Sequence, residues 1–103
     1  MQRVIGDVRM LIRSQDKTVL TNFANATDIM IDCIEEKKIE IIAILTRSRT
    51  KTKLGEYSTE EKAIKVLNMI ENFYSNIEYT KFMGCGREKI ASYIFQMPQD
   101  SEV

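Results

Sequence analysis

The chain has 103 residues, 44% hydrophobic and 29% charged, which is typical of one globular domain. Fifteen basic residues balance fifteen acidic ones, which counts against a general affinity for nucleic acid or an anionic membrane. Histidine is absent and the two cysteines, Cys33 and Cys85, are far apart, which excludes Cys/His zinc sites and a nucleophile–histidine mechanism. We therefore predict no enzymatic activity, no metal and no cofactor.

The cellular setting follows from what the sequence lacks. A membrane span needs about 18 consecutive apolar residues, and no such run is present. Met1–Arg9 has no apolar run of the length that a secretory signal needs. We expect a reduced, cytoplasmic protein with free thiols and no membrane association.

The N-terminal third contains weak strand signals. Residues 1–9 are predicted to be an extension that precedes a globular domain at 10–98. Met10–Arg13 and Thr18–Leu20 are short β-compatible runs. Between them, Arg13–Asp16 has two interpretations: a polar pocket that collects donors for a ligand, or a turn in which Asp16 bonds the backbone.

Two isoleucine-rich runs predict a β-hairpin. Asp28–Ile34 alternates, with Ile29, Ile31 and Cys33 on one face, and Ile39–Leu45 is strongly β-prone. A helix through 28–45 is the competing interpretation, and the density of β-branched residues counts against it.

The stretch 54–74 predicts a strand that leads into the main helix. Leu54–Tyr57 is the strand, and the helix is expected over about 59–75. Ser58 and Glu61 have the spacing of a capping box. A stripe at spacings of three and four predicts the buried face of the helix: Ala63, Val66, Leu67, Ile70, Phe73 and Tyr74.

The C-terminal part predicts two more strands, Ile77–Met83 and Tyr93–Met97, and a flexible tail at 99–103. Together, the segments predict an α+β fold. In it, a single antiparallel sheet of about five to six strands packs against the one main helix.

The strongest candidate for a binding site is a row of cations. If Thr46–Lys53 is extended, its basic residues all point one way: Arg47, Arg49, Lys51 and Lys53. Their repulsion would be relieved by a phosphate, which arginine binds in a bidentate manner. The competing interpretation is a solvated hairpin tip or a charged edge strand that prevents aggregation.

Further ligand contacts are predicted at Arg13 and Arg87. Arg87 follows Gly84 and Gly86, where a helix start would favour an anion, although a plain loop is the alternative. Tyr57 or Tyr93 would stack on a base, unless these aromatics belong to the core.

Three segments carry a family resemblance: MLIRSQDK at Met10–Lys17, LGEYSTEEKAIKVLNMI at Leu54–Ile70, and FQMPQD at Phe95–Asp100. They resemble a family of small proteins carried by Gram-positive bacteria, their phages and their mobile elements. The resemblance implies a strand-rich domain with one main helix and a start near Met10. Small phage proteins of this architecture include anti-defence factors, and the predicted fold looks similar to immune-signal sponges of the Thoeris anti-defence type.

The first functional hypothesis is therefore a non-enzymatic phage or mobile-element protein. It would bind and sequester a nucleotide-derived immune signal, such as a cyclic ADP-ribose derivative or a cyclic oligonucleotide, as a homo-oligomer. The alternative is a protein–protein interaction module that inhibits or modulates a host factor. It would use an exposed strand edge or the acidic half, residues 54–103, which contains eight Asp/Glu and five Lys/Arg. A single-stranded nucleic-acid binder is a third hypothesis, disfavoured by the neutral net charge.

Overall fold

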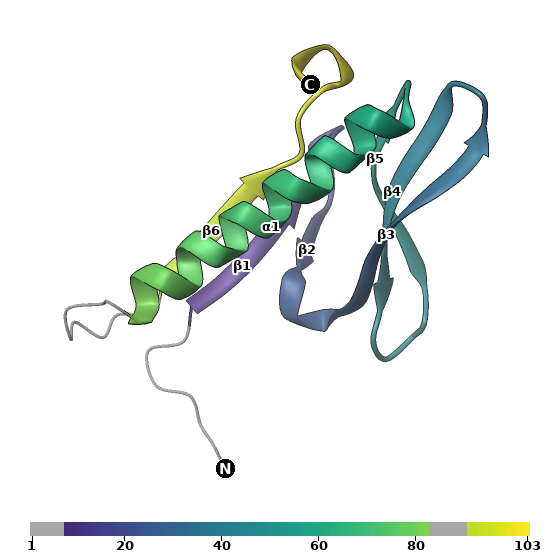
Figure 1. Ribbon diagram of the computed structural model, residues 1–103. Coiled ribbons are helices and arrows are strands. Elements are labelled where there is room, and N and C mark those ends of the chain that lie inside the picture. The colour runs from purple at the N-terminus through teal and green to yellow at the C-terminus, as the bar shows by residue number, and fades with distance from the viewer. Residues whose placement is uncertain (1–7, 83–90) are drawn as a thin grey trace.

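The computed structural model describes residues 8–82 and 91–103 (Figure 1). The described chain contains the following elements in order: β1 (Val8–Arg13), β2 (Leu20–Asn22), η1 (Phe23–Asn25), β3 (Ala26–Glu35), β4 (Lys38–Leu45), β5 (Lys51–Tyr57), α1 (Glu60–Phe82), β6 (Ala91–Gln96) and η2 (Asp100–Glu102). The α+β class is confirmed.

The strands form two three-stranded sheets, in the orders β2-β1-β6 and β3-β4-β5, so the prediction of a single antiparallel sheet is wrong. The break comes at the short 3₁₀ helix η1, where the Asn22 side chain accepts from the Ala24 N–H at 3.0 Å and turns the chain out of β2. In addition, β6 pairs with β1 in parallel. The 23 residues of α1 span about 35 Å. This length carries the chain back to the start of β1, and β6 then runs beside β1 in the same direction (Figure 1).

The predicted hairpin is confirmed as β3 and β4, which pair antiparallel with Ile31 opposite Ile41. Strand β5 continues the sheet on the other side of β4, with Ile42 opposite Lys53. Strand β3 is therefore one edge of this sheet and β5 is the other.

Helix α1 is longer than predicted. It continues to Phe82, so the strand expected over 77–83 is wrong as far as the structure describes it. Ile77, which is 6% exposed, extends the buried stripe of Ile70 and Phe73 at spacings of three and four, and helical burial therefore wins over the local alternation. The predicted cap is wrong by one residue, because the Thr59 hydroxyl accepts the Lys62 N–H at 3.1 Å.

The core lies between α1 and the two sheets. Helix α1 contacts β1 and β6 of one sheet and all three strands of the other. The largest side chains that are fully buried come from every layer: Tyr57, Ile12, Ile41, Leu54, Met97 and Val66. Each contributes roughly 1.5–3 kcal/mol by burial.

Both ends of the predicted domain differ from expectation. Strand β1 begins at Val8, inside the expected extension, and residues 1–7 lie outside the described part. The expected flexible tail instead forms η2, and the Asp100 carboxylate accepts from the Ser58 N–H at 2.8 Å. Within the described residues, no helix is both long and apolar enough to cross a membrane.

Candidate functional site

The predicted row of cations is interrupted by a turn. Residues 46–50 connect β4 to β5, with the Arg49 N–H donating to the Leu45 carbonyl at 2.9 Å and the Leu45 N–H donating to that of Thr50 at 3.0 Å. Arg49 has a φ of 60°, so the backbone is not extended there. Arg47 and Arg49 therefore lie in the turn while Lys51 begins β5, and the four cations do not form one face.

Three of the predicted residues follow one another through this turn into β5. Arg47, Arg49 and Lys51 are exposed, and none forms an ion pair with another described residue. A cleft of about 420 Å³ adjoins the turn, lined by Ala24, Asn25, Leu45, Thr46, Arg47 and Ser48. The fourth cation, Lys53, is already occupied, because its ammonium group lies 2.8 Å from Glu56 and 3.6 Å from Glu40. The hydrogen bond raises the pKa of Lys53 and lowers that of Glu56.

The other predicted contacts are not brought to this turn. The Arg13 guanidinium donates to the Lys17 carbonyl at 3.3 Å, in the loop that follows β1. Tyr93 packs partly buried against the core from β6, and Arg87 lies outside the described residues. Tyr57 is 1% exposed, and its ring cannot stack on a ligand, which corrects its predicted role.

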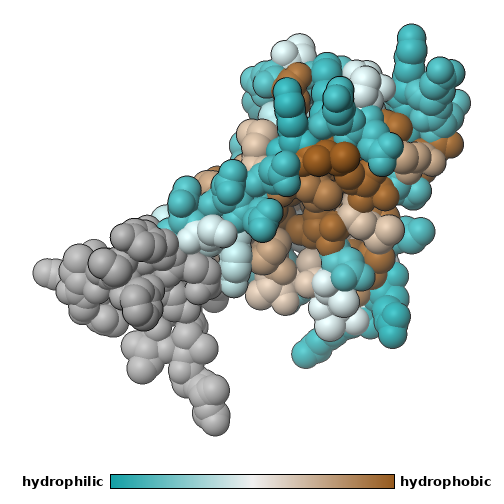
Figure 2. All heavy atoms as spheres, viewed as in Figure 1, coloured by the Kyte–Doolittle hydropathy of each residue, from teal (hydrophilic) through white to brown (hydrophobic). Residues whose placement is uncertain are grey.

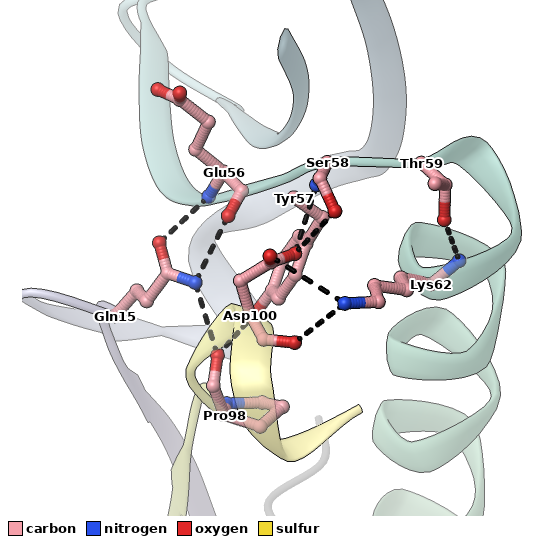
Figure 3. A network of polar contacts seen from close by, with 8 residues as sticks. All are labelled: Gln15, Glu56, Tyr57, Ser58, Thr59, Lys62, Pro98 and Asp100. Atoms are coloured by element: carbon pink, nitrogen blue, oxygen red, sulfur yellow. Dashed lines mark hydrogen bonds and ion pairs between the residues drawn. The ribbon is translucent and has the colours of Figure 1, made fainter. Parts of the chain in front are cut away.

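A polar network explains why Tyr57 is buried (Figure 3). Its hydroxyl donates to the Pro98 carbonyl at 2.7 Å, and burial, reinforced by Asp100 and Glu102, raises its pKa. The Gln15 amide donates to the same carbonyl at 3.1 Å, donates to the Glu56 carbonyl at 3.0 Å and accepts from the Glu56 N–H at 2.8 Å. Gln15 thereby joins the end of β1 to the edge of β5.

The network continues to the start of α1. Asp100 accepts from the Ser58 N–H and hydroxyl, and its carboxylate lies 3.5 Å from the Lys62 ammonium group. The Ser58 backbone bond is the main reason that the pKa of Asp100 is lowered. A pocket of about 380 Å³ borders the network, but the polar side chains that line it already have hydrogen-bond partners within the protein: Ser14, Gln15, Asp16, Lys53, Glu56, Gln99 and Asp100. We assign this network to stability.

Of the two interpretations of Arg13–Asp16, a ligand pocket or a turn, the structure shows the turn. Asp16 accepts from the Ser14 hydroxyl at 2.7 Å and from the Thr18 N–H at 3.0 Å. These bonds lower the pKa of Asp16 to about 2.

A different surface, which the sequence did not single out, is an exposed apolar groove. A groove of about 310 Å³ runs between α1 and the start of β3 and is mostly apolar, lined by Phe23, Ala26, Thr27, Asp28, Ile29, Leu67, Ile70, Glu71 and Tyr74. Figure 2 shows apolar side chains gathered on this face, beside α1. Ile64, one turn before Leu67 on α1, is 46% exposed and extends the apolar surface.

The groove is open because β3 is at the edge of its sheet. Among the described elements, β3 pairs with β4 alone, so the backbone groups on its other side face outward. The helix covers the inner face incompletely, and Ile29, Ile31 and Leu67 are only partly buried. Two further apolar residues of β3 are exposed, Met30 at 41% and Ile34 at 46%.

The described residues contain no cluster of three or more side chains of the types that hold metal ions.

No protein family, curated protein or solved structure matches this chain. The geometry of the described residues therefore carries the functional argument.

Proposed function

We propose that this protein is a non-enzymatic interaction module that binds an apolar segment of another protein in the groove between α1 and β3. The carrying observation is that this groove combines an apolar lining with partly exposed side chains on two elements. Contiguous exposed apolar surface with a polar rim is typical of protein-binding sites.

The composition of the groove favours a protein segment over a small polar ligand. Small-molecule sites enclose the ligand and aim several polar groups at it. Here the charged residues of the lining are both acidic, Asp28 and Glu71, beside an open apolar surface. An apolar segment flanked by basic residues is complementary to this arrangement.

The same carboxylates disfavour a second copy of this chain as the occupant. A twofold dimer through this face would bring together two linings that contain acidic residues, Asp28 and Glu71, and no basic one. Like charges at such an interface oppose association.

A library of displayed random peptides of about ten residues tests the proposal, since that length is the upper end of common strand lengths. Peptides enriched on the protein should bind Met69→Lys and lose binding to Ile64→Lys. The two positions are similarly exposed, at 41% and 46%, on different sides of α1, so the pair isolates the groove from the general effect of an added charge. Equal binding to both variants would refute the groove as the site.

Light scattering gives the second readout. We expect a monomer at micromolar concentration. A dimer that Ile64→Lys dissociates would show that the groove is a self-interface, and the proposal would then be wrong.

A nucleotide-type anion at the β4–β5 turn is the second candidate function, and it rests on a specific observation. Arg47, Arg49 and Lys51 have no anionic partner among the described residues. Arg47 lines a cleft together with Thr46 and Ser48. The phage and anti-defence setting is the one that the family resemblance suggests.

Thermal-shift measurements with cyclic oligonucleotides and ADP-ribose derivatives test this candidate. A ligand at about ten times its Kd stabilises by about 1.4 kcal/mol, and the melting temperature should rise by several degrees. Arg47→Ala should remove the rise, whereas Lys65→Ala, an exposed cation on α1, should keep it. If none of these ligands shifts the melting temperature, the turn does not bind them.

A further inference from the structure

The outer face of the β3-β4-β5 sheet carries a row of like charges. The strand registers place Asp32 opposite Glu40, and Glu40 opposite Glu56. Lys53 forms the ion pairs of this row, 2.8 Å from Glu56 and 3.6 Å from Glu40. The positive charge of Lys38 also contributes to the lowered pKa of Glu56. Asp32, at the β3 end of the row, has no ion pair with a described residue and faces the carboxylate of its cross-strand neighbour. Like charges directly opposite are destabilising.

Strand β3 as a whole repeats this pattern. It contains ten residues with three carboxylates, Asp28, Asp32 and Glu35, and no lysine or arginine. Asp28, Met30 and Asp32 share the outer face, because successive side chains alternate. Ile29 and Ile31 share the inner face, next to the groove.

We infer that β3 receives an extended strand of the partner protein, which adds to the sheet beyond β3 and presents basic side chains opposite Asp28 and Asp32. The side chain between these two positions, opposite Met30, would be apolar. The inner side chains of the added strand would be apolar and continue the surface of Ile29 and Ile31 into the groove. This inference rests on the proposed function and specifies the partner of that same site.

Two features of the sheet support strand addition. Strand β3 is ten residues long, and the alternate residues whose backbone groups point away from β4 offer a free edge of full strand length. Backbone pairing along such an edge supplies affinity, while alternate side chains supply specificity. A cation opposite Asp32 would also pair with the one carboxylate of the row that has no ion pair with a described residue.

A second copy of this chain does not meet these requirements. Another β3 brings further carboxylates and no cation. The other edge of this sheet, β5, has Lys51 and Lys53, but Gln15 bonds the edge from Leu54 to Glu56, so the stretch before that bond is only Lys51–Lys53.

The test uses a fluorescent peptide of about seven residues, a common strand length. Valine occupies every second position, for the inner face, and lysine, leucine and lysine follow in order at the positions between. We expect anisotropy to show binding that weakens about tenfold or more for Asp32→Lys. Asp28→Lys should act in the same direction and covers the case in which Asp32→Lys fails to fold. Glu36→Lys is the matched control, since it makes the same charge change in the turn after β3 and should change affinity by less than about twofold.

Two modified peptides make the test specific to strand pairing. Methyl groups on one set of alternate amides should abolish binding, while methyl groups on the other set should not, because an added strand bonds β3 through one side. A peptide with glutamate in place of lysine should bind Asp32→Lys better than it binds the unmodified protein.

The outcomes separate this inference from the proposed function. If library peptides depend on Ile64 but tolerate both methylation patterns and Asp32→Lys, the groove binds a segment and strand addition is wrong. If no peptide distinguishes Ile64→Lys from Met69→Lys, the proposed function itself fails.

Discussion

Tyr57 and Gln15 both donate to the buried Pro98 carbonyl, at 2.7 and 3.1 Å, and a double-mutant cycle measures their dependence on one another. Tyr57→Phe removes one donor and leaves the other, so it should cost about 1 kcal/mol of unfolding free energy. Gln15→Met removes three bonds at a half-buried sheet edge that water can reach, and should cost about 2 kcal/mol.

The double variant should cost more than the sum. With both donors gone, the Pro98 carbonyl is buried without a hydrogen bond, a state that costs about 1–3 kcal/mol. We expect a coupling energy of about 1 kcal/mol, which corresponds to roughly 4–8 °C in melting temperature for a domain of this size.

Urea denaturation followed by far-ultraviolet circular dichroism measures the cycle. Tyr93→Phe is the control, because the Tyr93 hydroxyl has no hydrogen bond with a described residue, and it should change stability by less than about 0.5 kcal/mol. Additivity within about 0.3 kcal/mol would refute the shared carbonyl. A Tyr57→Phe protein of unchanged stability that has lost nucleotide binding would instead restore Tyr57 as a ligand residue.

Three further predictions concern backbone and charge. Arg49→Gly should raise the unfolding free energy by about 0.5–1 kcal/mol, because glycine adopts a φ of 60° without strain. A lower unfolding free energy in urea denaturation would instead show that the turn needs the arginine side chain. Gly55→Ala should cost about 1–3 kcal/mol, since a Cβ there would lie 3.1 Å from the Tyr57 ring and 3.3 Å from Met97, both fully buried; an unchanged urea midpoint would contradict this packing. The pKa of Asp16 is lowered, so its contribution to folding stability is complete above its ordinary pKa of 3.8 and is lost as the pH falls toward about 2. Asp16→Asn should therefore flatten the dependence of unfolding free energy on pH in that range, and an unaltered slope would count against the hydrogen bonds of Asp16.

The sequence by itself determined the elements whose local residue pattern matches the structure that they adopt in the fold. The isoleucine runs form β3 and β4 because β-branched residues favour strands, and the stripe from Ala63 to Phe73 forms α1 because its spacing matches a helical turn. The Asp16 turn was among the alternatives, since its bonds are made within a few residues.

The tertiary structure decided what depends on distant partners. Ile77 belongs to the helix because it is buried beside the core. Ser58 does not cap the helix, because its N–H and hydroxyl bond Asp100, which lies far along the chain. The alternating cations at 46–53 fix neither strand nor turn locally, so the position of the β4–β5 turn set their arrangement. Whether β3 would be central or an edge was also undetermined, because strand order depends on contacts between segments far apart, and that order is what leaves the groove open.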